Sequence, residues 1–124
     1  MKTTLFIAVA ALALAGCETK LSALSAAPPG KVAEVDPFYG TIEISAGVAL
    51  AFECTYDIQP CQNATAAVVD PDIAEVRPAL LEELSPDAVT PPTTFLIIGK
   101  VPGDTTLRIE GDASDADFSV TVIE

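Results

Sequence analysis

The chain lacks histidine and tryptophan, and it has only 6 basic residues against 18 acidic ones among its 124 residues. Covalent catalysis usually pairs a nucleophile with a histidine base, and no serine here stands in the G-x-S-x-G pattern of hydrolases. We therefore predict that the protein is not an enzyme and uses no cofactor and no small-molecule substrate. Nucleic acids and anionic lipid surfaces attract basic proteins, so the formal net charge of −12 argues against both.

A long apolar run is also missing. The apolar segment Leu5–Leu14 has ten residues, about half of the roughly 20 that a membrane-spanning helix needs. Lys2 precedes this segment, and the small residues Ala15 and Gly16 follow it, immediately before Cys17. A positively charged start, a short apolar segment and small residues at a cleavage site indicate a secretory signal peptide.

The residues Leu14-Ala15-Gly16-Cys17 resemble the lipobox of bacterial lipoproteins. In that family the cysteine thiol receives a diacylglycerol, the chain is cut before the cysteine, and the new amine is acylated. The resemblance implies a signal peptide over residues 1–16 and lipidation of Cys17, whose acyl chains would hold the protein on a bilayer. In the family an aspartate after the cysteine favours inner-membrane retention, so Glu18 favours the outer membrane. The alternative is an ordinary signal peptide with an incidental cysteine.

Removal of the first 16 of the 124 residues leaves 108, enough for one domain, with a formal net charge of −13 because Lys2 is lost. Residues 17–35 are rich in serine, alanine, proline and glycine and lack a sustained apolar face. We therefore expect a flexible tether after the lipidated cysteine, and a domain at residues 36–124 that stands away from the membrane surface.

Cys54 and Cys61 are the two remaining cysteines. An even pair in an exported chain favours a disulfide. A metal-thiolate pair is the alternative, but no histidine or third free cysteine is present to complete a zinc site.

From residue 36 onward, apolar and polar residues alternate in short segments between turn residues, which is typical of strands with one buried face. The clearest segment places Leu50, Phe52 and Cys54 on one side. Strands are expected at residues 41–44, 48–56, 64–69, 73–76, 93–98, 105–109 and 118–122, and one or two helical turns within 78–92, with Leu80, Leu81 and Leu84 facing inward. The predicted fold class is all-β: a single small antiparallel Ig-like β-sandwich of about seven short strands.

Two turn motifs carry a second resemblance. Asp70 and Pro71 lie in the segment V-D-P-D-I-A-E-V, and Gly99, Pro102 and Gly103 lie in I-G-K-V-P-G-D-T-T-L. Together these segments are similar to the N-terminal domain of pilus-formation secretins and, more loosely, to bacterial Ig-like domains. Pro102 and Gly103 also suit the central positions of a type II turn, so both motifs fit turn chemistry without any binding role.

Asp112, Asp115 and Asp117 crowd one predicted loop and are a weak candidate for a Ca²⁺ site. Oxygen-rich loops bind Ca²⁺, but the spacing and central glycine of an EF-hand are missing. We therefore expect a solvated acidic hairpin loop and predict no metal site.

These observations favour a membrane-anchored lipoprotein that presents a non-catalytic Ig-like interaction module in the periplasm, as an accessory of a pilus or secretion assembly of the secretin type. The expected partner is another envelope protein, bound at an exposed sheet edge or at the 78–92 insert. The alternative is a surface-displayed Ig-like module for adhesion or structure. The expected location is the outer membrane with the domain facing the periplasm; the inner membrane and the cell surface are the alternatives.

Overall fold

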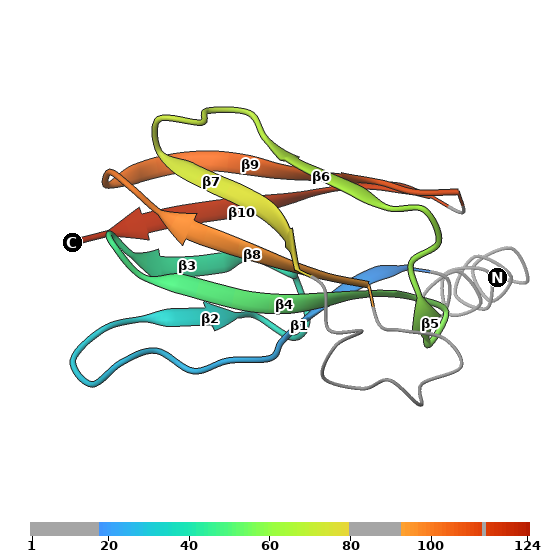
Figure 1. The fold of residues 1–124 in the computed structure, drawn as a ribbon, viewed down its shortest axis with the longest axis horizontal. Helices are drawn as coiled ribbons and strands as arrows, with labels where there is room; N and C mark the ends of the chain where they lie inside the picture. The colour runs from blue at the N-terminus through green and yellow to red at the C-terminus, as the bar shows by residue number, and fades with distance from the viewer. Residues whose placement is uncertain (1–17, 80–92, 113) are drawn as a thin grey trace, which may run out of the picture.

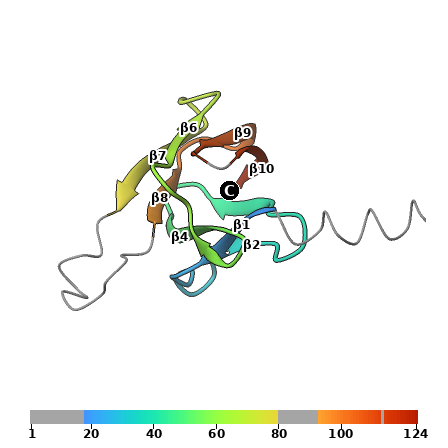
Figure 2. The same ribbon diagram turned by 90° about the vertical axis from the view of Figure 1, so that its right-hand side faces the viewer.

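A computed structural model describes residues 18–79, 93–112 and 114–124. The described residues form two β-sheets that pack face to face, as the two ribbon views show (Figure 1 and Figure 2). The strands are β1 (Thr19–Ala23), β2 (Ala33–Val35), β3 (Ile42–Ser45), β4 (Ala49–Tyr56), β5 (Gln59–Pro60), β6 (Thr65–Val68), β7 (Ala74–Ala79), β8 (Thr93–Gly99), β9 (Gly103–Glu110) and β10 (Asp115–Ile123). Within these ranges no helix is long and apolar enough to cross a membrane.

The strand order identifies the topology. One sheet runs β1-β4-β8-β7, with β5 pairing with β4, and the other runs β2-β3-β10-β9-β6. Constant-type immunoglobulin domains place strands A, B, E and D in one sheet and C, F and G in the other. Here β1, β4, β8 and β7 take the first set of places, and β6, β9 and β10 take the second. The predicted all-β, Ig-like sandwich is confirmed.

The pairing differs from the prediction in two respects. β3 runs parallel to β10, with Val120 opposite Ile42, whereas the other described pairs are antiparallel. Ten described strands replace the expected seven, because β1, β2 and the short β5 are added. β1, β2 and β5 are short, and each pairs with a neighbouring strand through backbone hydrogen bonds. Such a segment can be a strand without a long alternating pattern of apolar residues.

The core follows the alternation of apolar residues. On β4 the side chains of Leu50, Phe52 and Cys54 are fully buried, and on β10 those of Phe118, Val120 and Val122 point inward in the same way. The aromatic ring of Phe52 lies 5.7 Å from that of Phe95, its cross-strand neighbour on β8, measured between ring centroids. Burial of these side chains is the main stabilising term of the sandwich.

The largest difference concerns residues 17–35, which were expected to form a tether. β1 and β2 lie within this range and pair with β4 and β3. The Leu21 side chain is buried, and the N–H of Ala51 donates a 2.9 Å hydrogen bond to the hydroxyl of Ser25. The described domain therefore begins at β1 rather than at residue 36. The segment adds to an existing sheet edge mainly through backbone hydrogen bonds, which leave little trace in the apolar pattern.

The insert at residues 78–92 is described only at its start, where Pro78 and Ala79 continue β7. The predicted helical turns, with Leu80, Leu81 and Leu84, lie outside the described residues.

Candidate functional site

The cysteine pair forms the disulfide expected from the sequence. Cys54 lies on β4 and Cys61 directly follows β5, and their Cα atoms are 5.5 Å apart. Both side chains are buried. The bridge closes the short β4–β5 hairpin at its base, so it holds the two-residue turn between these strands in a defined position.

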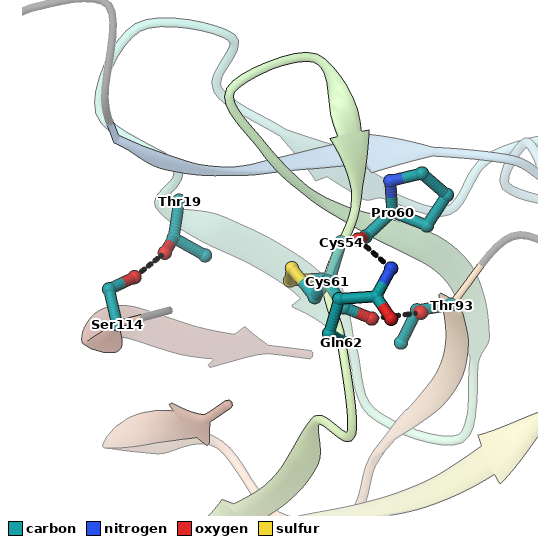
Figure 3. Close-up of a disulfide and its surroundings, with 7 residues drawn as sticks. All are labelled: Thr19, Cys54, Pro60, Cys61, Gln62, Thr93 and Ser114. Atoms are coloured by element: carbon teal, nitrogen blue, oxygen red, sulfur yellow. Dashed lines mark hydrogen bonds between the residues drawn. A yellow bond between two sulfur atoms is a disulfide. The ribbon is translucent and has the colours of Figure 1, made fainter. Parts of the chain in front are cut away.

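Hydrogen bonds tie the neighbouring segments to this hairpin. The hydroxyl of Thr93, at the start of β8, donates to the carbonyl oxygen of Cys61, and the hydroxyls of Thr19 and Ser114 lie 2.6 Å apart (Figure 3). The first of these contacts joins β8 to the disulfide, and the second joins the start of β1 to the β9–β10 connection. Hydrogen bonds and the disulfide thus connect neighbouring segments at the end of the sandwich where β1 begins.

The two turn motifs lie together at the opposite end of the sandwich, where β7 begins and β8 ends. The backbone N–H of Asp70 donates to the hydroxyl of Thr105 at 3.0 Å, and the Lys100 ammonium donates to the carbonyl oxygen of Pro71, also at 3.0 Å. A Cβ atom on Gly99 would lie 2.7 Å from the carbonyl oxygen of Ser45, so only glycine fits this close approach. The motifs therefore hold the sheets together.

The predicted type II turn at Pro102 and Gly103 is wrong in its geometry. Gly103 has a φ of 157°, far from the roughly +80° of that turn type, and it already belongs to β9. Val101 and Pro102 form a bend instead. The side chain of Ile73 lies close to Gly103, 3.1 Å from where a Cβ atom would stand. A side chain at position 103 would therefore crowd Ile73.

The acidic residues 112, 115 and 117 do not converge on a common point. The Asp112 carboxylate accepts a 2.7 Å hydrogen bond from the side-chain amide of Asn63, and Asp117 lies 3.6 Å from the guanidinium of Arg108. A hydrogen bond to Glu110 and the charge of Asp117 raise the pKa of Arg108 above its ordinary value. Asp115 lies at the start of β10. Among the described residues, no three potential ligands group as a metal would require.

Three of the four outermost strands of the two described sheets, β7, β2 and β6, offer poor templates for a partner strand. Edge strand β7 contains Pro78, which has no N–H to donate, and it carries an ion pair of 2.8 Å between Arg77 and Glu75. The edge strands β2 and β6 are only 3 and 4 residues long. Proline, charge and shortness are the usual means by which edges avoid pairing with other chains. These features discourage the expected strand addition at β7, β2 and β6.

An exposed aromatic turn, residues 37–40, is a feature that the sequence analysis did not identify. The Asp36 carboxylate accepts hydrogen bonds from the N–H groups of Phe38 and Tyr39, at 2.8 and 2.9 Å. Gly40 closes the turn with a φ of 69°, and a Cβ atom there would lie 2.5 Å from the ring of Phe118. The turn is thus held firmly while the side chains of Phe38 and Tyr39 are 87% and 81% exposed. In the sequence, the turn is indicated by Asp36-Pro37 with Gly40 three residues after the proline.

Another exposed apolar residue, Ile58, lies in the turn between β4 and β5. Asp57 and Ile58 have φ values of 51° and 61°, the positive pair that a two-residue type I′ hairpin turn requires. A β-branched residue is disfavoured in this conformation. The Ile58 side chain is nonetheless 97% exposed, so no packing within the described domain compensates for the strain.

Replacing Ile58 with glycine is expected to stabilise the domain by about 0.5–1 kcal/mol, since relief of left-handed backbone strain gains about 1–2 kcal/mol and the flexible unfolded glycine costs about 0.5–1 kcal/mol. The measurement is the melting temperature by circular dichroism. Ile58→Val is the matched control, because valine keeps the strain, and it should leave the melting temperature unchanged. A lower melting temperature for the glycine variant would contradict the assigned turn.

A cavity connects the aromatic turn with the start of β1. It has a volume of about 350 Å³, and its lining includes Glu18, Phe38, Tyr39, Ser114 and Phe118. Glu18 directly precedes β1 and is exposed. The cavity is therefore open beside the first described residue of the chain, with two exposed aromatic rings on one side of it.

Comparisons with known proteins show likeness in fold alone. No protein-family model matches the chain, and no characterised protein matches its sequence. Domains 4–9 of the surface layer protein SbsC match with a TM-score of 0.51 and 13% identity, over 86% of this chain and 14% of that one. Domains 4 and 5 of the S-layer protein SbsC match with a TM-score of 0.49 and 12% identity, over 84% of this chain and 51% of that one. The chain thus spans only a part of each of these proteins.

Proposed function

We propose that this chain is a lipid-anchored, non-catalytic Ig-like module of the bacterial cell envelope, with a structural or adhesive role at the cell surface. The observation that carries the proposal is the Ig-like sandwich itself, which resembles domains of a surface layer protein at a TM-score of 0.51. A sandwich of this kind supports many unrelated functions, so the remaining support comes from the residues of this chain.

The membrane anchor rests on the lipobox. The segment Leu14-Ala15-Gly16-Cys17 lies outside the described residues, and its lipidation is inferred from its resemblance to bacterial lipoproteins. The exposed position of Glu18, directly before β1, supports it because a lipid on the preceding residue could reach a bilayer without unfolding the domain.

The absence of histidine from the whole chain supports a non-catalytic role, and so does the disulfide, which consumes the thiols of Cys54 and Cys61. The pilus accessory in the periplasm draws no support from the structural comparisons. It stays a prediction based on the two turn motifs, and those motifs have a packing role in this fold.

Three measurements test the proposal. Mass spectrometry of the protein purified from membranes should find residues 1–16 absent and a lipid adduct on Cys17, and Cys17→Ser should release the protein from the membrane fraction. Protease treatment of intact cells should then remove the domain, while a periplasmic marker protein survives. Survival of the domain until the outer membrane is permeabilised would overturn the surface location, and recovery of an unlipidated chain would overturn the anchor.

A further inference from the structure

The position of β1 leaves almost no tether between the lipidation site and the domain. Only Glu18 separates Cys17 from Thr19, the first residue of β1, and Thr19 is paired with Tyr56 on β4. The expected tether of residues 17–35 would have let the domain stand away from the bilayer. With β1 in place, a lipid on Cys17 brings the start of β1 directly to the membrane surface.

The surface around the start of β1 displays the most exposed large apolar side chains of the described residues. Ile58 lies two residues beyond Tyr56, the partner of Thr19, and Phe38 and Tyr39 line the same cavity as Glu18. Figure 2 looks onto the end of the sandwich where β1 begins. The bend between β8 and β9 lies at the opposite end of the sandwich (Figure 1). Val101 belongs to this bend and is less exposed, at 54%. The most exposed apolar side chains thus flank the attachment point.

We propose that Phe38, Tyr39 and Ile58 insert into the interfacial layer of the bilayer and seat the domain on the membrane with β1 at its base. The inference rests on the proposed lipid anchor. Aromatic rings with a polar tip, such as that of Tyr39, concentrate at the membrane interface, and Phe38 and Ile58 add apolar area beside it. The acyl chains retain the protein, and these three side chains set its orientation.

The strained turn at Ile58 fits this role. Backbone strain that persists without compensating contacts points to a function outside the isolated fold. An exposed isoleucine with a φ of 61° costs stability in water, and contact with lipid gives that side chain an apolar environment.

The charges nearby indicate which lipids this surface accepts. Glu18, Asp57 and Asp115 are exposed around the start of β1, with Lys20 as a basic neighbour. Carboxylates are repelled by the negative surface potential of anionic lipids. The seating should therefore be strongest on zwitterionic headgroups, such as phosphatidylcholine, and weaken as anionic lipid is added.

The absence of tryptophan from the chain makes a direct test possible. Phe38→Trp and Ile58→Trp each introduce a single reporter at an exposed position, and Val101→Trp is the matched control at the opposite end. The full lipidated protein carrying each variant is reconstituted into phosphatidylcholine vesicles with brominated acyl chains, which quench tryptophan in contact with lipid. Melting temperatures confirm that each variant is folded.

The tryptophans at positions 38 and 58 should be blue-shifted and lose most of their emission, while the tryptophan at position 101 keeps its emission. If either reporter near β1 is unquenched although mass spectrometry shows the lipid on Cys17, the seating is wrong and the anchor stands. Equal quenching at position 101 would also overturn it, because the domain would then lie on its side. A blue shift in native membranes but not in pure lipid vesicles would assign the surface to a protein partner instead. Absence of the lipid adduct overturns both proposals.

Discussion

Replacing Phe52 with alanine is expected to lower the free energy of unfolding by about 3–5 kcal/mol, the range for loss of a fully buried phenylalanine. The Phe52 ring is wholly buried in the middle of β4 and packs against Phe95 on β8. Domains of this size are stabilised by about 5–15 kcal/mol, so the variant would be close to unfolding. Thermal unfolding followed by circular dichroism measures the effect.

Phe38→Ala is the matched control, because it removes the same ring from a position that is 87% exposed. Its effect on stability should stay within about 0.5 kcal/mol, as for most surface substitutions. Similar losses for the two variants would contradict the assignment of Phe52 to the core and of Phe38 to the surface.

Removing the disulfide with Cys54→Ala and Cys61→Ala is expected to cost about 2–2.5 kcal/mol, since the bridge closes a short loop with a sequence separation of 7. Both side chains are buried, so lost packing adds to this figure. A shift of about 4–8 °C in melting temperature per kcal/mol makes the effect easy to detect in a domain of this size.

Reductant provides the control for this second experiment. It should lower the melting temperature of the unmodified protein and leave that of the double variant unchanged, because no bridge is left to reduce. Equal stability of the oxidised protein and the double variant would show that the β4–β5 hairpin holds its position without the disulfide. Since Ile58 lies in this hairpin, the double variant should also weaken lipid contact at position 58.

Several elements followed directly from the sequence. Alternation over β4, β9 and β10 predicted the strands and the side that each buries, because a strand turns successive side chains to opposite faces. The even pair of Cys54 and Cys61, in a chain expected to be exported, predicted their bridge. These features depend on near neighbours in the chain, and local patterns report such neighbours reliably.

Other elements could not be read in this way. β1 carries a single buried side chain, Leu21, in a segment that resembles a linker in composition. It is a strand because β4 presents hydrogen-bonding groups to it, and β4 lies more than 25 residues further along the chain. In the same way, the close approach of Ile73 to Gly103 joins residues that are far apart in the chain.

The sequence by itself determined the all-β class, the buried faces of the main strands, the disulfide and the acidic, histidine-free chemistry, because each depends on residue type and short-range spacing. Only the tertiary structure decided that β1 begins beside Glu18, and that Phe38, Tyr39 and Ile58 surround this point. Strand pairing over long separations brings these segments together, and backbone hydrogen bonding of that kind has no signature in the local order of side chains.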